Sequence, residues 1–386
     1  MALLHTILLE YVPFLVLLFA LFTISGGVRI KGNLGGAPVA NLGLLTVGTF
    51  LASLMGTTGA AMLLIRPLLR SNAHRRYKVH TLVFFIFLVA NIGGSLTPLG
   101  DPPLFLGFLK GVSFFWTTSH LFHEMLFAAC VLLTLYFLID LGLYMKEGRP
   151  TDPAKVHGRK SARIGIEGGV NLVLLLGVIG AVLMSGMWNS GIELGAGDLQ
   201  ISLQDLSRDL LLLAFAGLSL LLTDKETREF NNFSWEPIEE VGKLFFGIFI
   251  TMIPTIAMLK AGPQGAFRDI IAMVTHDGQP VNHMYFWLSG ILSSFLDNAP
   301  TYLVFFNTAG GDASHLMLDA PLTLAAISCG SVFMGANSYI GNAPNFMIRS
   351  IAESQGVKMP SFFGYMLWSV GILIPLFLIM TLVFFK

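Results

Sequence analysis

The sequence has 386 residues, of which 54% are hydrophobic and only 12% are charged, and its formal net charge is zero. Soluble domains carry about twice that charged fraction, and a neutral chain lacks the basic surface that nucleic-acid binding requires. Several apolar runs exceed the roughly 18 residues that mark a membrane span. The composition therefore predicts an all-α polytopic membrane protein embedded in the lipid bilayer, and it excludes a nucleic-acid partner.

The first apolar run, 7–24, has no basic segment before it and no small-residue cleavage site after it. We therefore expect a retained span rather than a signal peptide. The next apolar block, 39–69, is flanked by Lys and Arg on both sides and contains GTTG at 56–59. Basic loops collect on the cytoplasmic side, so this block is predicted to enter and return as a re-entrant hairpin with its tip near 56–59. A single kinked span is the alternative.

An apolar run from 79 to 115 is interrupted by NIGGSLTPLGDPP at 91–103, which contains three Gly, three Pro and Asp101. Proline removes a backbone donor, and freed backbone groups in a bilayer are tolerated only inside protein or along a wet cavity. A helix that breaks within the membrane, with a carboxylate at the break near 93–103, is typical of a transporter's binding site. A proline kink with Asp101 as a structural helix cap is the alternative.

Four spans are expected to lead from this region to the second half of the chain, at 121–145, 168–188, 210–222 and 241–259. Asp140, near the end of the first of these, is expected to be solvated. The loop after it is predicted to be cytoplasmic, because it contains Lys146, Arg149, Lys155, Arg159, Lys160 and Arg163. The loop after the second span contains few Lys or Arg and is expected outside.

The second half of the chain repeats the pattern of the first. A block at 284–306 contains FLDNAPT, which predicts a hairpin tip near 296–301, and a block at 322–348 is interrupted by GANSYIGNAPN at 335–345. A last span is expected at 363–385. A shift of 241 positions places GTTG on DNAP, and LGDPP on IGNAP, without a gap. The loops around 284–306 contain few Lys or Arg, so the second hairpin is expected to open outside.

These patterns predict two inverted-topology repeats, which is the architecture of alternating-access transporters. The first repeat is assigned to 1–145 and the second to 241–386. The segment 146–240 contains the basic loop and the connecting spans. Each repeat is expected to contain one re-entrant hairpin and one broken transmembrane helix.

Polar residues cluster at the predicted tips and breaks, where half-helix ends leave carbonyl and N–H groups unpaired. Hydroxyl, amide and carbonyl oxygens at such breaks suit a hard cation such as Na⁺. We therefore expect an ion- and proton-binding site built from Asp101, Asp297, Asn298, Thr57, Thr58, Ser95, Thr97, Thr301, Asn337, Ser338 and Asn342. Within it, Na⁺ is expected at Thr57, Thr58, Asn298 and Asp297. Ordinary capping of helix ends is the alternative.

Asp101 and Asp297 are the two acids at the predicted breaks. A buried carboxylate can exchange a proton for a cation, because burial favours its neutral form and a bound cation favours its charged form. Asp297, at a hairpin tip, is the preferred proton carrier, with helix capping as the alternative. No Arg or Lys lies within either break, which argues against an anionic substrate.

The chain resembles the ion-transporter superfamily in three segments, which are NIGGSLTPLGDPPLFLGFLKG at 91–111, FLDNAP at 295–300 and GANSYIGNAPN at 335–345. Within that superfamily it most resembles sodium/proton antiporters that are also catalogued as citrate-transporter-like. The resemblance implies two inverted repeats, a homodimer, and a cation at Thr57, Thr58, Asn298 and neighbouring breaks. The Ser-Asn-Thr triplet of dicarboxylate-carrier relatives is absent at both tips, which disfavours carboxylate transport.

The sequence therefore predicts a secondary active transporter rather than an enzyme, with Na⁺/H⁺ antiport as the leading function. A cation-coupled carrier of citrate or another organic anion, or of an oxyanion such as arsenite, is the alternative. An intramembrane aspartyl protease would require Gly-x-Gly-Asp, whereas Pro98-Leu99-Gly100 precede Asp101. We expect no cofactor beyond the transported Na⁺ and H⁺, and a multi-pass location in a bacterial inner membrane.

Overall fold

The computed structural model describes residues 2–32, 35–150, 165–196, 199–231, 233–261, 264–276 and 279–386. These residues fold mostly into helices, and seven of the described helices are long and apolar enough to cross a membrane. Their bounds are Leu3–Ser25, Pro38–Met55, Val79–Leu96, Trp116–Lys146, Val170–Met187, Glu236–Leu259 and Phe362–Phe384. The prediction of a multi-pass integral membrane protein is confirmed. Outside the described residues lie four cations of the predicted basic loop, Lys155, Arg159, Lys160 and Arg163.

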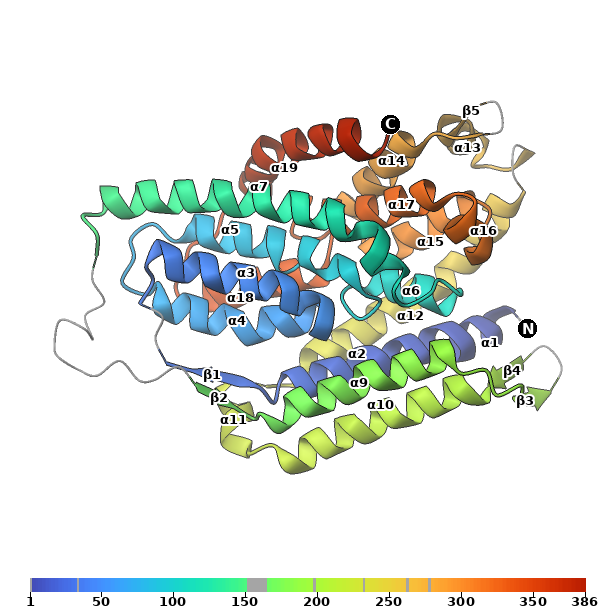
Figure 1. Cartoon of the computed structure of the whole chain (residues 1–386), viewed down its shortest axis with the longest axis horizontal. Helices are drawn as coiled ribbons and strands as arrows, with labels where there is room; N and C mark the ends of the chain where they lie inside the picture. Colours follow the sequence, from blue (N-terminus) through green and yellow to red (C-terminus); the bar gives the residue numbers. More distant parts are fainter. Residues whose placement is uncertain are drawn as a thin grey trace.

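The N-terminal helix and two connecting helices, α2, α9 and α10, lie side by side along one edge of the molecule (Figure 1). In chain order the elements of this part are α1 (Ala2–Thr6), η1 (Ile7–Tyr11), α2 (Val12–Ser25), β1 (Arg29–Lys31), β2 (Gly165–Glu167), α9 (Val170–Met187), β3 (Glu193–Ala196), β4 (Leu199–Ser202), α10 (Leu203–Leu222) and α11 (Lys225–Phe230). The predicted span at 210–222 lies within α10, which begins earlier because the Ser202 side chain caps its first turn.

Helices α3 (Pro38–Met55) and α4 (Thr57–Ser71) are joined by Gly56 alone and pack against each other. Gly56 has a φ of 81°, a left-handed conformation that glycine adopts without strain. A Cβ at this position would also lie 3.3 Å from the carbonyl oxygen of Leu99. The residue that reverses the chain therefore also lets the next segment approach it closely.

The following segment is broken into three pieces, α5 (Val79–Leu88), the short 3₁₀ turn η2 (Ile92–Leu96) and α6 (Pro102–Leu109). Pro at the first position of α6 suits a helix start, because its missing N–H would have no partner there. Between η2 and α6 the backbone folds back on itself, so that a Cβ on Gly100 would collide with the carbonyl oxygen of Gly94. Only glycine permits this contact, which explains the glycines of the break.

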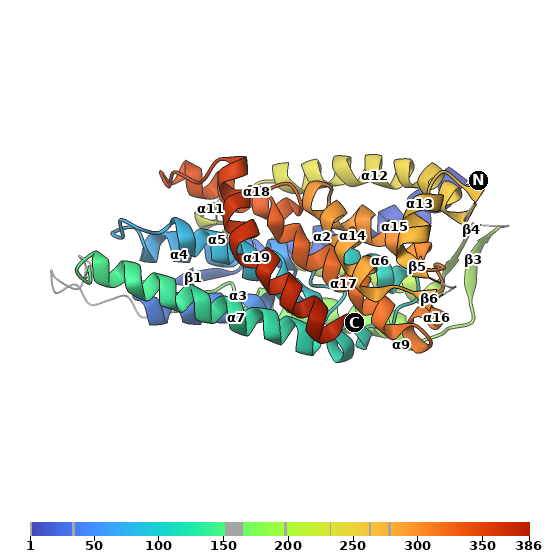
Figure 2. The same cartoon turned by 90° about the horizontal axis from the view of Figure 1, so that it is seen from above.

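The second half of the chain also contains helices that are separated by short unwound segments. Helices α7 and α12 lie along opposite edges of the molecule (Figure 2). A Cβ on Gly341 would meet the carbonyl oxygen of Gly335, as at Gly100 and Gly94. In chain order the remaining elements are α7 (Trp116–Lys146), α12 (Glu236–Lys260), α13 (Arg268–Val274), β5 (Thr275–His276), β6 (Gln279–Pro280), α14 (Asn282–Phe295), α15 (Asn298–Thr308), α16 (Ala313–Leu318), α17 (Pro321–Met334), η4 (Gly335–Asn337), α18 (Ala343–Ser354) and α19 (Phe362–Phe384).

The broken segment lies at the centre of the protein, because 94% of the span Val79–Leu96 is buried against 28% for the spans of α7 and α19. Phe84, Phe85 and Phe87 of this segment are completely buried. A helix that is apolar all round is normally surrounded by other helices. The polar break that follows α5 is therefore also held inside protein.

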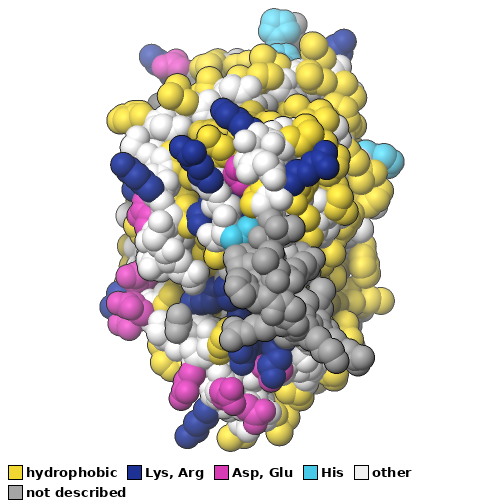
Figure 3. Space-filling view, turned by 90° about the vertical axis from the view of Figure 1, so that its left-hand side faces the viewer, with side chains coloured by type: hydrophobic (Ala, Val, Ile, Leu, Met, Phe, Trp, Pro, Cys, Tyr) yellow, Lys and Arg dark blue, Asp and Glu magenta, His cyan; other side chains and the backbone are white. Residues whose placement is uncertain are grey.

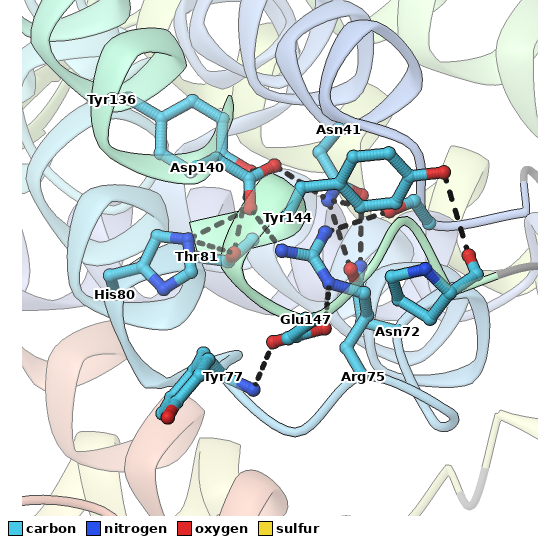
Figure 4. A network of polar contacts seen from close by, with 12 residues as sticks. Asn41, Asn72, Arg75, Tyr77, His80, Thr81, Tyr136, Asp140, Tyr144 and Glu147 are labelled. Carbon is cyan, nitrogen blue, oxygen red and sulfur yellow. Dashed lines mark hydrogen bonds and ion pairs between the residues drawn. The ribbon is translucent and has the colours of Figure 1, made fainter. Parts of the chain in front are cut away.

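A buried ion-pair network joins the start of α3 and the loop after α4 to the end of α7 (Figure 4). Arg75, in the loop after α4, is 2% exposed. Its Nη2 lies 2.8 Å from Oδ1 of Asp140, and its Nε lies 2.9 Å from Oε2 of Glu147. Its Nη1 donates to the carbonyl oxygen of Gly36 at 2.9 Å. The guanidinium thus fixes the start of α3 and the end of α7 to one loop.

Asp140 is completely buried, which corrects the expectation that it is solvated. Besides Arg75, its carboxylate contacts His80 Nε2 at 2.9 Å, the Tyr136 hydroxyl at 3.1 Å and the Asn41 amide at 3.3 Å. These partners replace water around the charge, which is the condition for burying a carboxylate. Several Lys and Arg side chains are spread over the surface at this end of the molecule (Figure 3).

Candidate functional site

Asp101 lies at the point where four helices begin. It immediately precedes α6, Thr57 and Asn298 are the first residues of α4 and α15, and Asn342 immediately precedes α18. The Thr57 hydroxyl donates to Oδ1 of Asp101 at 3.0 Å, and the Asn342 amide donates to the same oxygen at 3.1 Å. The Asn298 amide donates to Oδ2 at 2.5 Å. Helix starts carry partial positive charge, so their convergence favours the buried carboxylate, which is 2% exposed.

The two unwound segments are also joined directly through asparagines. The Asn342 amide donates to the carbonyl oxygen of Ala90 at 2.9 Å, and the Asn91 amide donates to Oδ1 of Asn345 at 2.8 Å. Asn345 in turn donates to the carbonyl oxygens of Gly335 and Ser338, both at 2.9 Å. Asn342 of the second break therefore satisfies a backbone carbonyl of the first, whereas Asn345 satisfies carbonyls of its own break.

Ser53 and Ser294 brace the two breaks in the same way. Ser53 donates to the carbonyl oxygen of Gly93 at 2.5 Å and Ser294 to that of Met334 at 3.1 Å. The hydroxyls of Thr97 and Ser338 donate in return to the carbonyl oxygens of Ser53 and Ser294, respectively. Each member of one set lies 241 residues before its counterpart. Both unwound segments are therefore held to their neighbouring helix by matching hydroxyl bonds.

Two amide oxygens beside this cluster have no hydrogen-bond partner among the described residues. Oδ1 of Asn298 and Oδ1 of Asn337 are buried and accept no hydrogen bond from any described residue. An unsatisfied buried acceptor is costly, and amide oxygens are ligands for hard cations. Among the described residues no group of three His, Cys, Asp or Glu side chains is arranged to hold a metal.

Three further predicted site residues make hydrogen bonds within their own segments. The Ser95 hydroxyl donates to the carbonyl oxygen of Ile92 at 2.9 Å, and Thr301 donates to that of Asp297 at 3.1 Å. The Asp297 carboxylate accepts the N–H of Ala299 at 3.1 Å, which is the helix-capping alternative for this residue. The structure thus brings Thr57, Asn298 and Asn342 onto Asp101, while Asp297 makes no hydrogen bond to that carboxylate.

A cavity of about 680 Å³ opens beside the cluster, between α2 and α12 on one side and α4, α6 and α18 on the other. Asp101, Thr57 and Thr58 line it, and so does Arg66 from the middle of α4. Arg66 is the one basic residue among the described lining residues. In the sequence, Arg66 is one of the Lys and Arg residues that flank the block 39–69, and nothing there marks it as a site residue.

Sequence reasoning missed four further residues of the cluster. Asn91 and Asn345 stand inside the motifs that mark the breaks, but neither was assigned a role. Ser53 and Ser294 lie outside those motifs, although the shift of 241 positions that aligns the breaks also aligns these serines. Extending the alignment by a few residues would have found them.

A family model described as "Putative citrate transport" matches residues 1–385. The chain belongs to this citrate transport family. No curated protein matches the chain. Because this family consists of secondary transporters, the protein is a transporter and not an enzyme. The family's description agrees better with the organic-anion alternative of the sequence analysis than with Na⁺/H⁺ antiport.

Proposed function

We propose that this member of the citrate transport family carries citrate or a related organic anion across the membrane, coupled to a cation, by alternating access. The observation that carries the proposal is the Asp101 carboxylate, which lines the cavity and is held by three neutral side chains from α4, α15 and the second break. An anionic substrate and a carboxylate in one cavity repel each other unless a cation or a proton lies between them. Coupling follows from that requirement.

The coupling cation is proposed to bind at Asp101 with oxygens of Thr57 and Asn298. Asn298 is completely buried, and its free Oδ1 supports this assignment. The hydroxyl of Thr57 already lies 3.0 Å from the carboxylate. Asp101 therefore replaces Asp297 as our preferred exchanger of protons and cations, since Asp297 is engaged as the cap of α15.

Alternating access is proposed to rest on two inverted repeats, 1–145 and 241–386, each with a re-entrant helix pair. Matching elements begin at equivalent positions under the shift of 241, since α4 and α15 begin at Thr57 and Asn298. In Figure 1 the open ends of the pairs α3–α4 and α14–α15 point toward opposite ends of the molecule. The serine braces match under the same shift. Two similar halves of opposite orientation can exchange conformations and so expose one site to either side.

The test of the proposed function is uptake of labelled citrate by proteoliposomes under a Na⁺ gradient and, separately, under a pH gradient. We expect uptake that depends on at least one gradient and that is lost in Asp101→Asn. Arsenite should be tested in parallel as the oxyanion alternative. Citrate-independent proton movement without citrate uptake would contradict the proposal.

Na⁺/H⁺ exchange is the second candidate, and one observation favours it. The hydrogen-bond partners of the Asp101 side chain are all neutral, so its charge must be balanced by a cation or a proton. A pH-sensitive dye inside the same liposomes separates the candidates. Exchange would alkalinise or acidify the lumen in response to Na⁺ alone, whereas coupled transport requires citrate.

The homodimer and the bacterial inner membrane remain predictions from the resemblance. Mass measurement of the detergent-purified protein should give two copies of the chain. The predicted cytoplasmic end, which Figure 3 views, should be the side from which a cysteine at Lys78 reacts with an impermeant reagent.

A further inference from the structure

We propose that Arg66 binds a carboxylate group of the transported anion; this inference rests on the proposed function. Arg66 lines the same cavity as Asp101 and is the single basic side chain among the described residues that do so. The cavity would then have two chemically different poles. A cation or proton would bind near Asp101, and a carboxylate of the substrate would bind near Arg66.

The position of Arg66 on α4 directs it toward the site. Thr58, Met62 and Arg66 follow one another at intervals of four residues and all line the cavity, as expected for one face of a helix. Arg66 lies eight residues after Thr58, which corresponds to about 12 Å along the axis. Side chains of a helix lean toward its N-terminus, so the long Arg66 side chain shortens that separation. A small organic anion would therefore lie between the guanidinium and the start of α4.

The guanidinium of Arg66 has no hydrogen-bond or ion-pair partner among the described residues. Its Nε and Nη1 are buried and make no hydrogen bond to any described residue, and Arg66 takes part in no ion pair or ring contact with them. Arg75, in contrast, contacts two carboxylates and a carbonyl oxygen. Unsatisfied donors of a charged group are expensive to bury. A bidentate carboxylate is the ligand whose geometry fits the guanidinium fork.

The remaining charges of the cavity do not satisfy Arg66. Glu236 and Glu240 line the cavity from the first turns of α12, but both are exposed. Their charges are screened by water and salt. Asp101, in turn, is engaged by Thr57, Asn298 and Asn342. The binding capacity of Arg66 therefore remains available to a ligand that enters the cavity.

The test compares citrate transport by Arg66→Gln with that of Arg70→Gln as the matched control. Arg70 lies one turn further along α4, donates to the carbonyl oxygen of Ile30 at 3.2 Å and covers the ring of Phe230. We expect Arg66→Gln to raise the KM for citrate by about tenfold or more, because a charge-assisted bidentate contact is lost. The maximal rate and the half-saturating Na⁺ concentration should change little. Arg70→Gln should keep the wild-type KM.

Arg66→Lys keeps the positive charge but loses the planar, bidentate guanidinium. Its KM for citrate should therefore lie between those of wild type and Arg66→Gln. It also preserves the test if Arg66→Gln does not fold. A KM for citrate that is unchanged in both variants, while wild type transports citrate, would overturn the role of Arg66 alone. A wild-type protein that transports no organic anion would instead overturn the proposed function.

A lipid headgroup phosphate is the other anion that could reach a guanidinium. Transport in vesicles of neutral lipid and of anionic lipid separates the two sources. Under our inference the KM effect of Arg66→Gln is the same in both lipids. If Arg66→Gln instead left the KM for citrate unaltered and changed transport only in vesicles of anionic lipid, Arg66 would be a lipid-binding residue. That result would contradict the inference.

Discussion

Asn298 and Asp101 are 197 residues apart in the sequence, yet the amide of Asn298 donates to Oδ2 of Asp101 at 2.5 Å. The first residue of α15 thus meets the residue that precedes α6. Neither helix start could hold the carboxylate alone, because Thr57 and Asn342 supply the other two donors. The site exists only when both halves of the chain have folded around it.

Replacing Asp101 by Asn should abolish coupled transport while the protein still reaches the membrane. The amide keeps the size of the carboxylate but cannot exchange a proton or neutralise a cation. One of the three donors now facing Asp101 would then face another donor, so we also expect a loss of about 1–3 kcal/mol in stability. Transport assays and thermal melts on purified protein measure the two effects.

Asp297→Asn is the matched comparison for that variant. Asn is as good a helix cap as Asp, and the Asp297 side chain bonds to the N–H of Ala299 rather than to Asp101. We expect transport within about twofold of wild type, since capping by either residue is worth a similar energy. A loss as large as that of Asp101→Asn would restore Asp297 as the proton carrier.

Ser53→Ala and Ser294→Ala should each destabilise the protein by about 1–3 kcal/mol, because each leaves buried backbone groups without a partner. The hydroxyl of Ser53 donates to the carbonyl oxygen of Gly93 and accepts the N–H of Leu96. Ser328→Ala is the control, since that buried hydroxyl donates to the carbonyl oxygen of Leu324 in its own helix and otherwise contacts the Tyr302 side chain, so its loss frees no backbone group of a break. Equal melting temperatures for Ser53→Ala and Ser328→Ala would refute the bracing role.

Gly100→Ala should prevent correct folding of the break, because a Cβ would collide with the carbonyl oxygen of Gly94. Gly142→Ala serves as the control, since a Cβ there meets nothing within 4 Å. That substitution should stabilise α7 by about 0.5–1 kcal/mol. Expression level and monodispersity report the difference, and two equally well-behaved variants would argue against the close approach.

Breaking the buried network by Asp140→Ala should cost about 3–5 kcal/mol, because Arg75 would lose a fully buried partner. The exposed pair of Lys243 and Glu239 offers a comparison, and Lys243→Ala should change the stability much less, because water and salt screen an exposed ion pair. Chemical denaturation of both variants measures the contrast. Similar costs for the two would mean that burial of the network contributes little.

The positions of the turns and breaks were predictable, because glycine and proline leave local signals. Gly56 stands where α3 reverses into α4, and Pro102 stands at the first position of α6. Membrane helices follow from composition in the same direct way, which is why the multi-pass architecture could be predicted. The range 335–345 encloses the second unwound segment, whereas the first one begins directly after Leu88, ahead of the predicted 93–103.

The roles of individual side chains were much less predictable. Asp101 and Asp297 look equivalent as acids at breaks, and only the fold reveals that one gathers three donors while the other caps its own helix. In the sequence, Arg66 falls among the basic residues at the end of the block 39–69, a pattern that indicates a cytoplasmic flank rather than a binding residue. Which face of a helix meets a cavity depends on packing partners from distant parts of the sequence.

The central claim is that the Asp101 cluster couples a cation to an organic anion, and calorimetric measurement of citrate affinity tests it most directly. Purified protein is titrated with citrate, with and without Na⁺ and across a pH series. Citrate should bind about tenfold or more tightly in Na⁺ or in acid. By linkage, citrate should tighten cation binding by the same factor. Asp101→Asn should abolish that dependence. A citrate affinity that is identical under all conditions, or that responds equally in Asp101→Asn, would contradict the account.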